Sequence, residues 1–219
     1  MSKDRNRLQR WFRLLGGPNW EGPEGRDRAL AEMTNAGVDD VMPLLVAKLS
    51  DRDLETRCAA IETMSLLDLE RATPLLVPLL RDPDETVRLT VCEYLASPRA
   101  QAAVEPLIAV LRSDPDVQVR GYAACALGVI ASPAAIPALL DALANDHELD
   151  CLGHSASSTS AHALDDILGT EFTRIRISDA TRKMRPGPPD LESLAREAEL
   201  VYRTWSRSGE PTDDTAAAH

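Results

Sequence analysis

Three of the four histidines in the sequence lie close together near position 150, with one cysteine among them. The side chains that could bind a divalent metal there are His147, Cys151, His154 and His162. Four such ligands would suit zinc. Their spacing matches no zinc signature, and Gly153 favours a loop over the helix that would place His147 and Cys151 on one face. We therefore predict no metal site and no cofactor.

The segment 146–160 is open to three interpretations, which are a solvated loop, a metal site and a loop that contacts a protein partner. Its polar run "SASSTS" is poor core material, so we expect an exposed loop that forms part of a partner surface. Cys151 has His154 nearby, but nothing in the sequence indicates a lowered thiol pKa or an oxyanion site. The sequence also has no Gly-rich phosphate loop, paired-carboxylate motif or nucleophile elbow, and we predict that the chain is not an enzyme.

The elements that position these residues come from a repeat with a period of 31 or 32 residues. Similar segments start at Val41, Ala72 and Ala103, and a fourth begins at Ala135. Each predicts a helical hairpin, whose first helix has apolar residues at helical spacing and whose second helix follows a short Asp-containing turn. We expect the first helices to begin near the marker prolines Pro43, Pro74, Pro106 and Pro137.

An aspartate and an arginine recur six residues apart in three of these units. The pairs are Asp51 with Arg57, Asp82 with Arg88, and Asp114 with Arg120. The hairpins and their Asp-x5-Arg pairs resemble the HEAT-repeat family, in particular the short bacterial HEAT-like repeats also found in phycobilisome lyase subunits. The resemblance implies that these residues form a structural ladder of charge-assisted contacts between successive units. We expect Arg88 to be the partner of Asp82.

The resemblance predicts an all-α fold, namely a short α-solenoid of about five stacked helical hairpins with a C-terminal capping helix. We expect the repeat array at 1–168, with a degenerate first unit at 4–36 and further units at 41–68, 72–97, 103–131 and 135–168. A basic linker or arm follows at 169–189, the capping helix at 190–208 and a disordered tail at 209–219.

The formal net charge of −11 argues against nucleic acid as the main partner, because phosphate binding needs a basic surface. The basic segment 173–186 is a local exception. No apolar stretch approaches the length of a membrane span, and the N-terminal residues do not form a signal peptide, so we expect a cytoplasmic location.

These features together predict a protein-binding scaffold or adaptor that presents its second helices to a protein partner of basic character. The candidate contacts are Trp20, Glu62, Glu93, Tyr94, Tyr122, His147, His154, Arg174 and Arg176. An enzyme or enzyme subunit of the HEAT-like lyase type, and an immunity or inhibitor protein, stay open as alternatives. Related hydroxylases hold iron with several His-Glu dipeptides, whereas this chain has one, His147–Glu148.

Overall fold

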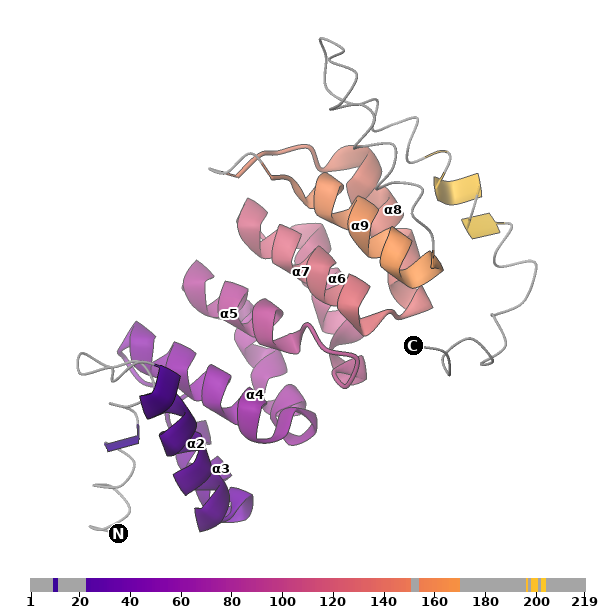
Figure 1. Ribbon diagram of the computed structural model, residues 1–219. Helices are drawn as coiled ribbons and strands as arrows, with labels where there is room; N and C mark the ends of the chain where they lie inside the picture. Colours follow the sequence, from indigo (N-terminus) through magenta and orange to yellow (C-terminus); the bar gives the residue numbers. More distant parts are fainter. Residues whose placement is uncertain are drawn as a thin grey trace, which may run out of the picture. The chain divides into compact units, whose positions relative to one another are not determined.

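The computed structural model describes residues 10–11, 23–150, 154–169, 196, 198–200 and 202–203. All regular elements among them are helical, as the sequence predicts (Figure 1). The candidate residues Trp20, Cys151, Arg174 and Arg176 lie outside the described residues. So do the tail at 209–219 and most of the arm and of the capping helix, which stay predictions.

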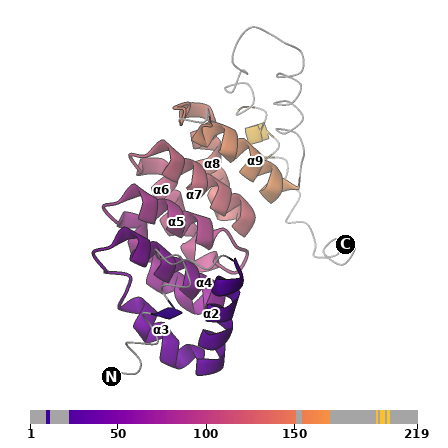
Figure 2. The ribbon, with the colours of Figure 1, turned by 60° about the vertical axis from the view of Figure 1, so that its left-hand side comes forward.

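The chain divides into two compact units, Met1–Leu107 and Ile108–His219. The N-terminal unit contains α2 (Pro23–Ala36), α3 (Val38–Val46), α4 (Leu54–Leu76), the 3-10 helix η1 (Val77–Arg81), α5 (Glu85–Leu95) and the 3-10 helix η2 (Gln101–Ala103). Figure 2 shows α2, α3 and α4 packed against one another, and α5 packs on α4. Before α2, the buried Trp11 donates a hydrogen bond from Nε1 to Glu32 Oε2 at 3.0 Å.

Helix α4 consists of two helices joined at a kink. Asp68 has extended backbone angles there (φ −162°, ψ 91°), and its Oδ1 accepts a hydrogen bond from the main-chain nitrogen of Arg71. Residues 54–67 therefore form the second helix of one hairpin, and residues 69–76 begin the first helix of the next.

The boundary between the two units falls within α6 (Val104–Ser113). The C-terminal unit continues with α7 (Val117–Ile130), the 3-10 helix η3 (Pro133–Ala135), α8 (Ile136–Asn145) and α9 (Ala156–Leu168). Helices α7 and α9 lie side by side, and α8 packs on α9.

The turns that lead into three of the second helices share one capping arrangement. The side chains of Asp53, Asp84 and Asp116 accept hydrogen bonds from main-chain N–H groups in the first turns of α4, α5 and α7. This confirms the expectation that an aspartate caps each of these helices.

The marker prolines only partly follow the prediction. Pro137 lies in the first turn of α8, but Pro43 and Pro74 lie inside helices. The prediction was wrong for these two because their helices start earlier, after Gly37 (φ +95°) and after the Asp68 cap. Each of these prolines therefore removes a helical N–H that could have donated to the preceding turn.

The core consists of aliphatic side chains that the two helices of each hairpin turn toward one another. Buried examples in the N-terminal unit are Met33, Leu45, Ile61, Met64, Leu76 and Leu95. Those in the C-terminal unit are Leu127, Ile136, Leu139, Leu143 and Leu164. Burial of one such side chain contributes about 1.5–3 kcal/mol, so the paired helical faces are the main source of stability.

Helix α7 lies directly against α9 because Gly128 has no side chain. A Cβ atom at this position would lie 2.8 Å from Ala163 Cα and 2.9 Å from Ala163 Cβ. Gly121 in the same helix is different, because a Cβ there would meet Thr159 Oγ1 at an ordinary 3.7 Å.

Gly128→Ala is expected to lower the free energy of unfolding by about 1–3 kcal/mol, because the added methyl group forces α7 and α9 apart. Urea unfolding followed by circular dichroism measures the change. Gly121→Ala is the matched control and should be as stable as the wild type or up to about 1 kcal/mol more stable, since alanine favours a helix. Equal destabilisation by the two substitutions would contradict the close-packing explanation.

Candidate functional site

The arginine of each Asp-x5-Arg pair is hydrogen-bonded to the turn of its own hairpin. Nη1 of Arg57, Arg88 and Arg120 donates to the main-chain carbonyl of Asp51, Asp82 and Asp114, at 3.0 Å in each case. The spacing of six residues thus positions a guanidinium over the turn that precedes its helix. A guanidinium has several N–H donors in one plane, so it can bond to this carbonyl and to a second acceptor at the same time. The single ammonium of a lysine does not have this fixed planar geometry.

The carboxylate contacts run to the next hairpin. Arg57 Nη2 lies 3.4 Å from Asp82 Oδ1, and Arg120 donates from Nε and Nη2 to the carboxylate of Asp146 at 2.6 and 3.0 Å. The Asp82 carboxylate thus contacts Arg57 of the preceding hairpin, a contact that the expected pairing of Asp82 with Arg88 does not include. Arg88 holds Asp82 through the main-chain carbonyl, and its stabilising role stays a prediction.

The same aspartates also shape the turns. Oδ1 of Asp82 accepts the main-chain N–H of Asp84 at 3.0 Å. Asp51 accepts the N–H of Asp53 in the same way, while the hydrogen bond from Lys48 is the main cause that lowers the pKa of Asp51. Hydrogen bonds from Thr56 lower the pKa of Asp53. In each of these turns the first aspartate accepts the main-chain N–H of the second. The second aspartate caps the helix that follows.

In the last hairpin a main-chain N–H group replaces the arginine of the ladder. Asp146 and Glu148 both accept hydrogen bonds from Arg120, the latter at 2.8 Å, and the hydrogen bonds that Arg120 donates to Asp146 are the main reason that its pKa is raised. No arginine follows Asp146 at the usual spacing. Its main-chain carbonyl accepts instead the N–H of Ser157, at 3.0 Å.

The segment 146–160 is not the exposed loop that the sequence predicts. His147, Glu148, Leu149 and His154 are exposed, but Ser155, Ala156, Ser157 and Ser160 are buried. The correction has a physical reason, since serine hydroxyls can bond to the main chain. Ser155 caps α9, and the Ser157 hydroxyl donates to the carbonyl of Leu143 at the end of α8, at 2.8 Å.

The histidines that the sequence offers as metal ligands do not come together at one site. His162 lies on α9 with Nδ1 2.8 Å from the carbonyl oxygen of Ser158, whereas His154 faces Asp150, with Nδ1 3.6 Å from Oδ2. Within the described residues, no three His, Cys, Asp or Glu side chains are grouped so that they could hold a metal ion. Cys151 lies outside those residues, so its predicted part stays untested.

On residues 54–67 and on α5, α7 and α9 the exposed charged side chains are all acidic, whereas the first helices carry exposed charges of both signs. Each unit has its own second-helix face, which we define as the exposed and half-buried side chains of its second helices. These are residues 54–67 and α5 in the N-terminal unit, and α7 and α9 in the C-terminal unit. The basic side chains of these helices are Arg57, Arg88 and Arg120, all in the ladder and no more than 13% exposed. The exposed charges that remain are acidic, namely Glu55, Glu85, Glu93 and Asp166.

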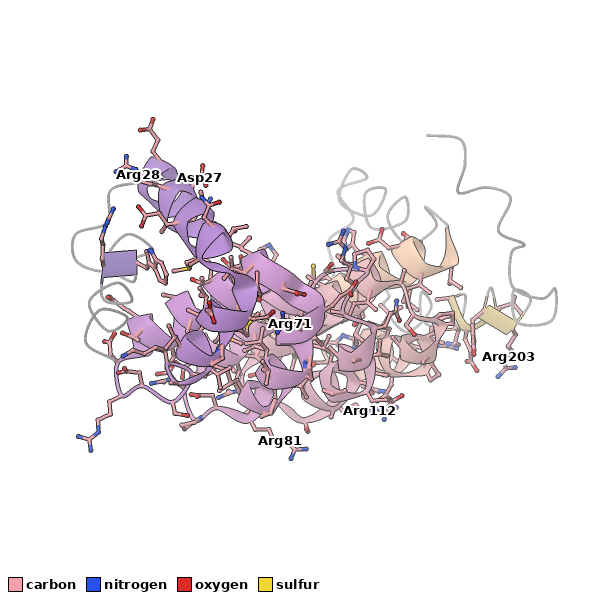
Figure 3. All side chains as sticks on the ribbon, turned by 90° about the horizontal axis from the view of Figure 1, so that it is seen from below. Asp27, Arg28, Arg71, Arg81, Arg112 and Arg203 are labelled. Carbon is pink, nitrogen blue, oxygen red and sulfur yellow. The ribbon has the colours of Figure 1, made fainter. Side chains whose placement is uncertain are left out.

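Three exposed arginines lie on first helices, and Arg28, Arg52 and Arg99 are exposed on α2 and in two turns. Arg71 lies in the second part of α4, Arg81 in η1 and Arg112 in α6, and all three are exposed. Figure 3 shows the side chains of Arg81 and Arg112 projecting from the ribbon.

Two of the predicted contact residues, Glu62 and Tyr94, come together on the second-helix face of the N-terminal unit. Burial raises the pKa of Tyr94, and Glu62, which is hydrogen-bonded to it, raises the pKa further. Arg26 Nη1 lies 3.3 Å from Glu62 Oε1, so α2 is tied to this cluster. Glu93 is exposed beside Tyr94 in α5.

A groove of about 280 Å³ opens on the second-helix face of the C-terminal unit. Its lining includes Gly121, Tyr122, Cys125, Asp150, His154 and Thr159. Burial and the nearby Asp166 carboxylate raise the pKa of the Cys125 thiol, which makes it a poor nucleophile at neutral pH. Sequence reasoning found Tyr122 and His154 but missed Gly121 and Asp150. A glycine inside a predicted helix was the available signal for Gly121.

The family comparison decides what this arrangement is. A family model described as HEAT repeats matches residues 13–96, 73–160 and 104–184. The chain belongs to the HEAT-repeat family. Its all-α solenoid fold, predicted from the repeated pattern, is thereby confirmed, and such a fold is a scaffold of similar stacked hairpins.

Two solved structures of engineered proteins align with most of this chain. A crystal structure of an engineered protein from the Northeast Structural Genomics Consortium aligns with a TM-score of 0.50 and 22% identity, over 90% of this chain and 96% of the other. A second engineered protein from the same consortium aligns with a TM-score of 0.47 and 21% identity, over 92% of this chain and 59% of the other. A search of curated proteins gives no match. Among the described helices, none has the length and apolar character that a membrane span requires.

Arg120→Ala is expected to lower the free energy of unfolding by about 2–4 kcal/mol, because it leaves Asp146 and the Asp114 carbonyl without their donor. Thermal and urea unfolding measure the change. Arg112→Ala is the matched control on an exposed first-helix position and should change the free energy by less than about 0.5 kcal/mol. A similar small effect of both substitutions would refute a stabilising ladder in this HEAT unit.

Ser157→Ala is expected to destabilise the protein by about 1–3 kcal/mol, because the buried carbonyl of Leu143 loses its donor. Ser160 is its matched control in the same helix. Its hydroxyl is also buried but has no hydrogen-bond partner among the described residues, so Ser160→Ala should leave stability unchanged or raise it. Chemical unfolding of the two variants provides the comparison, and the reverse order would show that the two hydroxyls are misassigned.

Proposed function

We propose that this HEAT-repeat chain is an adaptor that binds a basic segment of a protein partner on its second-helix face. The observation that carries the proposal is that residues 54–67, α5, α7 and α9 expose acidic side chains and no basic ones. The ladder holds the arginines of the second helices, so the exposed charges on that face are carboxylates. A face with one sign of charge attracts a partner of the opposite sign and disfavours others.

The face of the N-terminal unit has the stronger acidic character. Glu55, Glu85 and Glu93 are exposed on residues 54–67 and α5, and Glu62 is half-buried between them. Each exposed carboxylate contributes little alone because solvent and salt screen it. Several on one face together set the preference for a basic partner.

Apolar side chains on the second-helix face of each unit can supply the remaining contact. Leu66 is 50% exposed in the N-terminal unit, and Tyr122 and Val129 are 42% and 39% exposed in the C-terminal unit. Protein interfaces combine such apolar contacts with a polar rim, and tyrosine is enriched among the residues that dominate binding energy. This mixture favours a protein segment over a small ion as the occupant.

The test is fluorescence anisotropy with a fluorescein-labelled peptide of alternating lysine and alanine. The wild-type chain should bind it, and the double variant Glu55→Lys, Glu93→Lys should bind at least about tenfold more weakly. Binding should also weaken between about 50 and 200 mM salt.

The matched control is the double variant Glu70→Lys, Glu105→Lys, which makes the same change in net charge on exposed positions of first helices. It should change the affinity by about twofold or less. Equal weakening in both variants would show that only the net charge matters, and no binding by the wild type would overturn the proposal directly.

A further inference from the structure

One arginine on α2 contacts the acidic second-helix face of the N-terminal unit. Arg26 lies 31 residues before Arg57, which is the place of a ladder arginine in the preceding hairpin. The aspartate at the matching place of the next hairpin is Asp51, but its carboxylate contacts Lys48 Nζ at 2.7 Å. Arg26 Nη1 lies instead 3.3 Å from Glu62 Oε1. In this hairpin the arginine therefore contacts the second-helix face and not the ladder aspartate.

Arg26 is held more loosely than the arginines of the ladder. Its side chain is 42% exposed, whereas those of Arg57 and Arg120 are 13% and 11% exposed. Arg57 and Arg120 also donate to a main-chain carbonyl of their own turn, at 3.0 Å in each case. Glu62 is the one hydrogen-bond acceptor of Arg26 among the described residues. A half-exposed ion pair of this kind contributes little to stability, so a competing cation can replace one of its members.

The carboxylate of Glu62 keeps a second support when Arg26 leaves it. Tyr94 on the neighbouring helix α5 is hydrogen-bonded to Glu62. Burial, then Glu62 and Glu93, raise the pKa of Tyr94, so both carboxylates lie near the same hydroxyl group. Glu93 is exposed, whereas the side chain of Glu62 is only 20% exposed with Arg26 paired to it. Departure of the guanidinium would therefore give a partner access to a positioned carboxylate beside an exposed one.

We propose that Arg26 is an internal competitor of the basic partner, because it pairs with Glu62 in the free chain and a basic side chain of the partner displaces it. The exchange replaces one cation by another on the same carboxylate, and the displaced guanidinium returns to water, to which it is already partly exposed. Arg26 thus keeps the affinity of the face below the value that its carboxylates alone would give. The inference rests on the proposed function, since it names the regulation of that site.

The test measures the affinity of variants for the fluorescein-labelled lysine–alanine peptide by fluorescence anisotropy. Arg26→Gln keeps a long polar side chain without the charge and should raise the affinity about three- to fivefold, because the peptide no longer competes for Glu62. Arg81→Gln is the matched control, since it removes the same charge from an exposed first-helix position of the same unit. It should change the affinity by about 1.5-fold or less, because solvent and salt screen a distant charge.

A double-mutant cycle separates competition from an effect of net charge. In a chain that already contains Glu62→Gln, the added Arg26→Gln should change the affinity by about 1.5-fold or less, because the carboxylate for which the two cations compete is gone. An increase of about three- to fivefold that persists in this background would overturn the competition. Melting curves by circular dichroism establish that each variant is folded.

An NMR titration of the ¹⁵N-labelled wild-type chain with the unlabelled peptide tests the displacement without any substitution. The Nε atom of Arg26 is buried and has no hydrogen-bond partner among the described residues, so release of the side chain into water should shift its Nε–H resonance. The Nε–H resonance of the exposed Arg81 should not move. An unchanged Arg26 resonance at saturating peptide would contradict the displacement.

The competition and the proposed function fail in different ways. If Glu55→Lys, Glu93→Lys weakens binding as expected but Arg26→Gln and Arg81→Gln have equal affinities, the competition falls and the proposed function stands. If Arg26→Gln raises the affinity as expected but the two double charge variants bind the peptide equally, the competition stands and the proposed function falls. Absence of binding by both the wild type and Arg26→Gln would overturn both.

Discussion

A guanidinium group on residues 54–67 and another on α7 each connect two successive turns of this protein. Each group donates to a carbonyl of its own hairpin and to the carboxylate of the next, as Arg57 and Arg120 both show. A partly buried arginine is strongly destabilising without an opposite charge nearby, so the hairpin must repeat the same aspartate at the same place. The repeat in the sequence is therefore the consequence of this geometry. The ladder also removes the second-helix arginines from solvent, which leaves the exposed face acidic.

The last hairpin shows the consequence of a missing arginine. The main-chain N–H of Ser157 donates to the carbonyl of Asp146, where an arginine donates in the regular hairpins. Helix α9 starts at Ala156, ten residues after Asp146, instead of directly after the turn. Asp150 lies between these residues in the chain, and its carboxylate contacts Gln118 of α7. The irregular connection thus places a carboxylate on the groove, which a regular HEAT turn would not do.

Patterns that act within one hairpin could be predicted from the sequence, because helical periodicity and the capping aspartates depend on local spacing. The direction of the carboxylate contacts could not be predicted. Asp82 is six residues from Arg88 and 25 from Arg57, and only the stacking of hairpins brings the more distant arginine close. Residue type also misled the prediction for "SASSTS". Ser155 and Ser157 are buried because their hydroxyls bond at the ends of α9 and α8, which spacing along the chain does not reveal.

The two glycines of α7 differ in how closely the neighbouring helix approaches them. Gly128 and Gly121 both occupy a helix interior, where glycine is unfavourable. At position 128 the close approach to Ala163 explains the residue, because even one methyl group would collide. At position 121 no neighbour requires it, and the space it leaves belongs to the groove that contains Asp150. The two glycines therefore differ in kind, because Gly128 is required by the contact between α7 and α9 whereas Gly121 is not.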